Sequence, residues 1–116
     1  MLYEKNMNDA ESALKHFQAI NSLFERLKEI GVAVYEHQYY SLVFGSWTIV
    51  AGKRKQRTKF SWDGRDRFLD YSEADFPDSS YSSRDWKHIK NEKVDFKDSL
   101  NEYGRMEQYL YEKYSV

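Results

Sequence analysis

The middle third of the chain constrains the fold most, because short runs of β-branched and aromatic residues alternate with polar positions and turn signals. These runs occupy residues 32–44, 47–51, 58–62 and 67–72. Such a composition favours strands that each bury one face. The connections between the runs are only a few residues long, which is too short for the crossovers that parallel strands require. The pattern therefore predicts an antiparallel meander of about four strands.

A helix is predicted before the sheet, because apolar residues recur every three or four positions between residues 8 and 30. This interval places them on one face of an α-helix, where they would pack on the sheet. Asn8 with Glu11 fits a capping box at the start, and Gly31 is suited to end the helix in the left-handed conformation. His16 falls between two apolar positions and is expected to face solvent. The apolar face comprises Leu14, Phe17, Ile20, Phe24, Leu27 and Ile30.

Two more helices are predicted after the sheet. Ser83 is placed to cap a short helix around Trp86, and Ser99 with Glu102 repeats the capping-box spacing at the start of a C-terminal helix. The N-terminal and C-terminal helices would cover one face of the sheet. The fold class is thus predicted as α+β: an N-terminal helix, an antiparallel meander of about four strands, a short helix and a C-terminal helix packed on the sheet.

Composition limits the number of domains, the chemistry and the cellular location that the chain can have. The chain has 116 residues, 18 basic and 19 acidic side chains, a formal net charge of -1 and no cysteine. A chain of this size can bury a sizeable core, so residues 1–116 are predicted to form a single domain. The absence of cysteine excludes disulfides, thiolate metal sites and a cysteine nucleophile. The opening residues show no secretory pattern and no apolar run is long enough for a bilayer, so a cytoplasmic protein is expected.

Five positive charges lie within residues 53–59, at the expected tip of a hairpin. Four of them are Lys53, Arg54, Lys55 and Arg57. Such a tip can bind phosphate groups, which makes nucleic-acid binding the alternative functional hypothesis. It can also serve solubility, since lysine and arginine on a ribbon oppose aggregation. A nearly neutral chain lacks the basic balance typical of nucleic-acid binders, so this alternative is not favoured.

The next segment, residues 63–78, is acidic, with six carboxylates and two arginines. A basic tip and an acidic segment at different positions would orient a charged partner. Many of these aspartates can equally be turn residues, because Asp is common in turns and several lie next to Gly64 or Pro77. The segment is therefore predicted either as part of a docking surface or as a series of turns.

No catalytic motif is specific enough to assign. Asp78, Asp95 and Lys97 can be written as a metal-dependent nuclease site, with two carboxylates for the metal and a lysine to orient water. The match is weak, because Asp85 and Lys87 satisfy its second half equally well and the intervening segment is predicted to be helical. The histidines are not paired at metal-ligand spacing. Catalytic residues, metal ligands and cofactors are therefore not assigned, and an enzyme is the less favoured class.

Aromatic residues make up 17% of the chain, more than a small core needs, and tyrosine and tryptophan favour interfaces. Together with the segregated charges, this surplus predicts a small non-enzymatic protein-binding module, such as an inhibitor, an immunity-type protein or an accessory factor. Its partner is expected to be another protein or a second copy of the chain. The expected contact residues are Trp62, Asp63, Arg65, Asp66, Asp70, Asp75 and Asp78, with Lys53, Arg54, Lys55 and Arg57 as a steering element.

Overall fold

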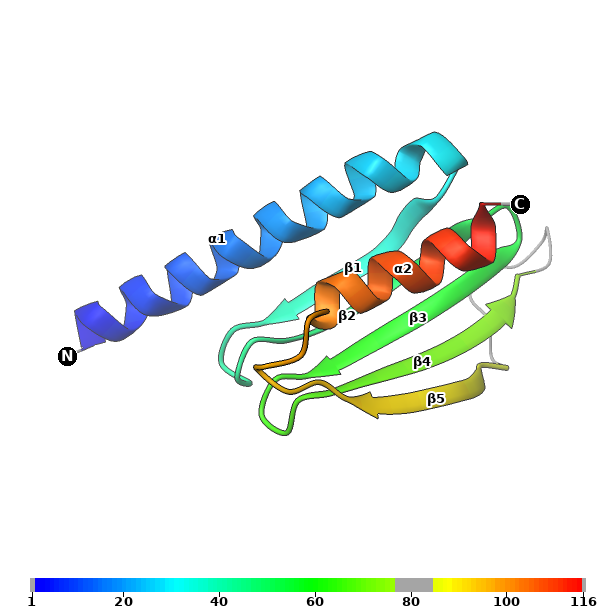
Figure 1. Cartoon of the computed structure of the whole chain (residues 1–116). Helices are drawn as coiled ribbons and strands as arrows, with labels where there is room; N and C mark the ends of the chain where they lie inside the picture. The colour runs from blue at the N-terminus through cyan, green and yellow to red at the C-terminus, as the bar shows by residue number, and fades with distance from the viewer. Residues whose placement is uncertain (1, 77–84, 116) are drawn as a thin grey trace.

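The computed structural model describes residues 2–76 and 85–115. They form a five-stranded antiparallel sheet in sequence order, with two helices across one of its faces (Figure 1). The predicted α+β class is confirmed, but the sheet has five strands rather than about four. No helix in the described ranges is long and apolar enough to cross a membrane. The elements are α1 (Leu2–Leu27), the short 3-10 helix η1 (Lys28–Ile30), β1 (Ala33–Tyr40), β2 (Ser46–Lys53), β3 (Gln56–Asp63), β4 (Phe68–Asp75), β5 (Lys87–Lys93) and α2 (Glu102–Tyr114).

The fifth strand replaces the short helix predicted around Trp86. β5 pairs antiparallel with β4, and the side chains of His88 and Asn91 lie within hydrogen-bond distance of the Asp70 carboxylate on that strand. Apolar side chains at helical spacing suggested a helix, but the edge of β4 offers backbone hydrogen bonds that local propensity does not record. Ser83, the predicted capping residue, lies outside the described residues.

The helix α1 begins at Leu2 rather than at Asn8, so Asn8 lies inside the helix and does not cap it. The residues before it include good helix formers, and the helix continues through them. The other end is as predicted. Gly31 adopts a φ of 84° in the left-handed region, and its N–H donates to the carbonyl of Lys28.

Only the second half of α1 contributes to the core. Ile20, Leu23 and Leu27 are buried, whereas Leu14 and Phe17 are 58% and 48% exposed. The first half of the helix extends beyond the end of the sheet (Figure 1), and Leu14 lies on the side of the helix opposite Leu23, away from the core. The prediction that Leu14 and Phe17 belong to the core is therefore wrong.

The core fills the space between the two helices and one face of the sheet. Side chains at alternate positions of β2, β3 and β4 point into it, as the pleat of a strand requires. Among the described residues, no helix lies on the opposite face of the sheet (Figure 1). The buried apolar cluster consists of Ile20, Leu23, Leu27, Val32, Trp47, Ile49, Ala51, Phe60, Trp62, Leu69, Tyr71, Val94, Met106, Leu110 and Tyr114.

The cap of α2 is Asn101 rather than the predicted Ser99. The Asn101 side chain accepts a hydrogen bond from the N–H of Gly104 at 2.9 Å, which satisfies one of the unpaired donors of the first turn. The capping-box spacing of Ser99 and Glu102 misplaced the helix start by two residues. Asparagine caps a helix as well as serine does, so the type of residue alone did not decide between the two positions.

Candidate functional site

One end of the sheet, which we call the loop end, carries three connections: residues 41–45, 64–67 and 94–101. The first half of α1 projects past this same end (Figure 1). The opposite end carries the β2–β3 turn and the junction between α1 and β1. An eight-residue strand spans roughly 25 Å, so features at the two ends form separate surfaces.

Large apolar side chains with high exposure gather at the loop end. Leu42 and Phe44 of the first connection are 80% and 67% exposed, and Phe96 of the third connection is 87% exposed. Phe17, whose ring packs against the rings of His37 and Tyr39 on β1, adds a partly exposed ring nearby. Clustered apolar exposure is uncommon on a soluble monomer and marks interaction surfaces. The loop end is therefore the candidate interaction surface of the chain.

A groove of about 620 Å³ opens at the loop end, on the face of the sheet that has no helix. We call it the acidic groove, because Asp63, Asp66 and Asp70 line it beside the rings of Phe44 and Phe68. Trp62 is only 5% exposed, so it forms part of the groove wall and does not project into solvent. The structure brings together here the predicted contact residues Trp62, Asp63, Arg65, Asp66 and Asp70.

The three carboxylates of the acidic groove differ in whether they already have hydrogen-bond partners within the chain. Asp63 Oδ1 accepts hydrogen bonds from the backbone N–H groups of Arg65 and Asp66, at 2.9 and 3.1 Å, and so holds the β3–β4 turn. Asp70 Oδ1 lies 2.8 Å from Nε2 of His88. The carboxylate of Asp66 has no hydrogen-bond or ion-pair partner in the described part of the chain. Asp66 is thus the carboxylate most available to a partner.

Gly64 allows the two loops beside the groove to pack closely. A Cβ at this position would lie 2.1 Å from the carbonyl oxygen of Phe44, so a side chain would displace the loop. The N–H of Gly64 donates to Ser46 Oγ at 2.9 Å, which ties the β3–β4 turn to the start of β2. The left-handed residue of the turn is Arg67, with a φ of 61°.

A second hollow, of about 680 Å³, lies between α1 and the helix-facing side of the sheet. We call it the aromatic cleft, because five rings line it. Phe44 and Trp62 line both hollows, so they separate the cleft from the groove. The rings are those of Tyr39, Phe44, Trp62, Phe96 and Tyr103. The charged residues of the cleft are Asp9, Lys15, Arg67 and Glu102.

His16 is buried beneath α1, with 2% of its surface exposed, so the expectation that it faces solvent is wrong. Its Nδ1 lies 2.8 Å from the Tyr103 hydroxyl, and its Nε2 lies 2.8 Å from Nε2 of His37. The contact between the two Nε2 atoms needs a proton on one of them and a free lone pair on the other, so the two rings are not both protonated at these nitrogens. Burial, followed by the charge of His37, lowers the pKa of His16 to about 4. With both nitrogens occupied, this histidine links α1 to β1 and α2 rather than acting as an available base.

Two adjacent histidines raise the question of a metal site. Within residues 2–76 and 85–115, no group of three or more His, Asp or Glu side chains is placed to hold a metal ion. Of the nuclease-like pattern, Asp95 lies in a turn before α2, where its N–H donates to Asp98 Oδ2 at 2.9 Å. The segment before it is the strand β5, so the objection that this segment is helical no longer holds. Asp78 lies outside the described residues.

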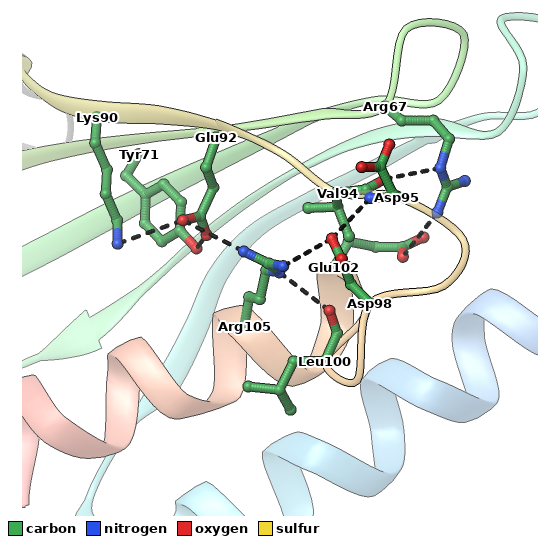
Figure 2. A network of polar contacts seen from close by, with 10 residues as sticks. All are labelled: Arg67, Tyr71, Lys90, Glu92, Val94, Asp95, Asp98, Leu100, Glu102 and Arg105. Atoms are coloured by element: carbon green, nitrogen blue, oxygen red, sulfur yellow. Dashed lines mark hydrogen bonds and ion pairs between the residues drawn. The ribbon is translucent and has the colours of Figure 1, made fainter.

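A network of ion pairs attaches α2 and the preceding connection to the sheet (Figure 2). Arg105 lies 3.5 Å from Glu92 of β5 and 3.1 Å from Asp98 of the connection. Glu92 also accepts a hydrogen bond from Tyr71. Burial, followed by this hydrogen bond, raises the pKa of Tyr71. The network fixes the first turn of α2, and with it Glu102 at the edge of the aromatic cleft (Figure 2).

The basic tip lies at the opposite end of the sheet from the acidic groove. Lys53, Arg54 and Lys55 line a hollow of about 440 Å³, and Lys53 Nζ donates to the carbonyl of Tyr114 at 3.4 Å. The predicted contact residues therefore form two surfaces rather than one.

Arg57 and Asp75 lie near the basic tip rather than at the acidic groove. The Arg57 guanidinium lies 3.5 Å from the ring centroid of Tyr35, and it lines a hollow of about 300 Å³ together with Asp75. Part of the acidic segment thus lies beside basic residues within the same molecule. Asp78, the remaining predicted contact residue, lies outside the described residues.

The chain matches no protein-family model, and comparisons with curated proteins and with solved structures give no match. Function is therefore inferred from the geometry of the loop end.

Proposed function

We propose that this chain is a non-enzymatic protein-binding module whose acidic groove binds a basic polypeptide segment that carries an apolar or aromatic anchor. One observation carries the proposal: Phe44 and Phe68, which are 67% and 38% exposed, stand beside Asp63, Asp66 and Asp70 in one groove. We place the chain among small inhibitors, immunity-type proteins and accessory factors.

The two kinds of side chain in the groove have different tasks in binding. Exposed rings offer large contact areas with few rotors to freeze, which suits them to receive an apolar anchor. Carboxylates attract lysine and arginine side chains, set the orientation of the partner and oppose acidic competitors. The carboxylate of Asp66 has no partner among residues 2–76 and 85–115, so its charge is available for this purpose.

The basic tip adds a charge separation along the strands. Its distance from the acidic groove, roughly 25 Å, is several times the Debye length of about 8 Å at physiological salt. We therefore expect the tip to orient a partner only at low salt. Neutralising Lys53, Arg54 and Lys55 together should change the association rate there and leave the dissociation rate unaltered. An association rate that is unchanged at low salt would remove the steering role.

A displayed library of random peptides, selected on the immobilised chain, tests the groove without a known partner. We expect the selected peptides to combine lysine or arginine with leucine, phenylalanine or tryptophan. A synthetic copy of one such peptide should bind more weakly as salt rises. Phe44→Ala should chiefly speed its dissociation, and Asp66→Lys should chiefly slow its association, with about a tenfold loss of affinity in each case.

Two variants on α2 serve as matched controls. Tyr111 is 57% exposed, so Tyr111→Ala removes a ring of similar exposure far from the groove, and Glu112→Lys reverses an exposed charge. Both should bind the peptide as the unaltered chain does. Selection of acidic peptides, or equal binding by Phe44→Ala and Asp66→Lys, would contradict the proposal. Light scattering that shows the 14.0 kDa chain doubling in mass, with doubling lost in Phe44→Ala, would assign the groove to a second copy instead.

Nucleic-acid binding is the second candidate, and one observation favours it. Four cations line the hollow at the basic tip: Lys53, Arg54, Lys55 and Lys113. Against it, the Tyr35 ring is already covered by Arg57, and Lys59 lies 4.7 Å from the centroid of Trp86, so these rings are occupied by cations rather than open to bases. Titration of a labelled oligonucleotide at two salt concentrations distinguishes the candidates, because the absence of binding at low salt removes this one.

A further inference from the structure

The aromatic cleft has properties that the acidic groove does not share. It opens on the helix side, its walls are rings, and its charges balance: Lys15 and Arg67 face the cleft together with Asp9 and Glu102. A lining with equal numbers of positive and negative groups suits a ligand that carries both signs better than it suits a simple anion or cation. The rings indicate that the remainder of such a ligand is aromatic.

Arg67 is held firmly at the cleft in an unusual backbone conformation. Its φ of 61° lies in the left-handed region, which is uncommon for a residue with a side chain. Its backbone N–H donates to the Asp63 carbonyl at 2.7 Å, and its Nε donates to the Val94 carbonyl at 2.9 Å. The guanidinium lies 3.8 Å from the ring centroid of Phe96 and 5.2 Å from that of Trp62.

The ion pair between Arg67 and Glu102 is loose. The distance from Arg67 Nη2 to Glu102 Oε1 is 4.0 Å, whereas a direct charge-assisted hydrogen bond measures about 2.7 to 2.9 Å. The two side chains are 20% and 14% exposed, so both charges are largely withdrawn from water. Each group therefore retains hydrogen-bonding capacity that its partner does not use.

We propose that the aromatic cleft binds a free α-amino acid with an aromatic side chain. Such a ligand carries its ammonium and its carboxylate on one carbon atom, so the carboxylate can pair with Arg67 while the ammonium pairs with Glu102. Two direct ion pairs then replace one long contact. The side chain of the ligand lies beside the rings of Tyr39 and Tyr103. This site goes beyond the proposed protein-binding function and does not depend on it.

The same geometry separates a free amino acid from related ligands. A polypeptide terminus supplies only one of the two charges, and so leaves either Arg67 or Glu102 without a new partner. An aromatic acid without an ammonium group, or an aromatic amine without a carboxylate, likewise supplies only one of the two charges. The strongest discrimination is therefore expected between L-tryptophan and its two analogues that lack one charged group, 3-indolepropionate and tryptamine.

Isothermal titration of the full chain with these three compounds tests the proposal. L-tryptophan should bind at one saturable site, and each analogue should bind at least tenfold more weakly. Absence of saturable binding of L-tryptophan at millimolar concentrations would overturn the proposal. So would equal binding of 3-indolepropionate, which shows that the ammonium is not recognised, or equal binding of tryptamine, which shows the same for the carboxylate.

Variants locate the binding on the molecule. Glu102→Gln keeps the shape of the side chain and removes its charge, so it should weaken L-tryptophan binding at least tenfold and leave 3-indolepropionate nearly unaffected. Glu112→Gln on the exposed side of α2 is the matched control, and unfolding midpoints show whether each variant is folded. Asp66→Lys should bind L-tryptophan normally, which distinguishes this site from the acidic groove. Normal L-tryptophan binding by Glu102→Gln would overturn the proposal.

Discussion

At the residue scale, His16 shows how a polar side chain can belong to a buried face. The most buried positions of α1 are His16, Ile20, Leu23 and Leu27, at intervals of four, three and four residues. That spacing is typical of one helix face. Hydrophobicity alone placed Leu14 on that face instead, although it lies on the other side of the helix. The signal for a buried imidazole was therefore present in the spacing, but its partners on β1 and α2 depend on the tertiary fold.

Burial of His16 makes stability depend on pH. Its pKa is about 4 in the folded chain, against 6.5 for an exposed histidine. Between these two values the unfolded chain binds a proton that the folded chain does not, so the free energy of unfolding falls as the pH falls. The contribution should be complete above pH 6.5 and lost by pH 4, and we expect it to be about 2 to 3 kcal/mol. Urea unfolding at pH 7, 5.5 and 4.5 measures it.

The variant His16→Gln supplies the comparison for this pH dependence. Glutamine cannot titrate, so its free energy of unfolding should vary less between pH 7 and pH 4.5 than that of the unaltered chain. The carboxylates titrate in both proteins and cancel in the difference. If both proteins lost the same stability over this range, His16 would not be the source.

Gly64 is expected to be required for packing rather than for its backbone angles. Gly64→Ala places a Cβ against the Phe44 carbonyl, so it should destabilise the fold by about 1 to 3 kcal/mol, as overpacking does. Gly104→Ala is the matched control, because its new Cβ meets the end of the flexible Leu100 side chain and alanine favours a helix. Thermal unfolding compares the two. A destabilisation no larger at Gly64 than at Gly104 would contradict the close approach of the loops.

At the scale of elements, periodicity and turn chemistry predicted the helix–meander–helix order and the left-handed end at Gly31. They did not predict β5, because the hydrogen bonds that the edge of β4 offers are invisible in the local sequence. They also did not predict that α1 extends beyond the sheet. The length of a helix follows from its own residues, whereas the position at which the sheet ends follows from strand register.

The two sides of α1 are expected to contribute unequally to stability. Leu23 is 2% exposed and Leu14 is 58% exposed. Leu23→Ala should cost about 2 to 5 kcal/mol, whereas Leu14→Ala should cost about 0.5 kcal/mol or less. Denaturant unfolding measures both changes in the same chain. Comparable losses would show that Leu14 is covered, either by the chain itself or by a second copy, which light scattering would then reveal.

At the scale of the whole molecule, the runs of charged residues predicted a basic tip and an acidic turn. They did not predict where the two lie relative to each other in the fold. The meander places them at opposite ends of the strands, and it divides the acidic segment so that Asp66 lies in the groove and Asp75 lies beside Arg57. The aromatic cleft was missed for a related reason. Its lining comes from α1, β1, β3, three connections and α2, which only the completed topology brings together.

Binding at the acidic groove is tested most directly by nuclear magnetic resonance. A basic peptide selected from the displayed library is titrated into the nitrogen-15-labelled chain. We expect the shift changes to concentrate in residues 40–46 and 61–70, where the acidic groove lies, and to spare residues 53–59 at the basic tip. Changes concentrated at the basic tip, with the groove unaffected, would contradict the proposed function.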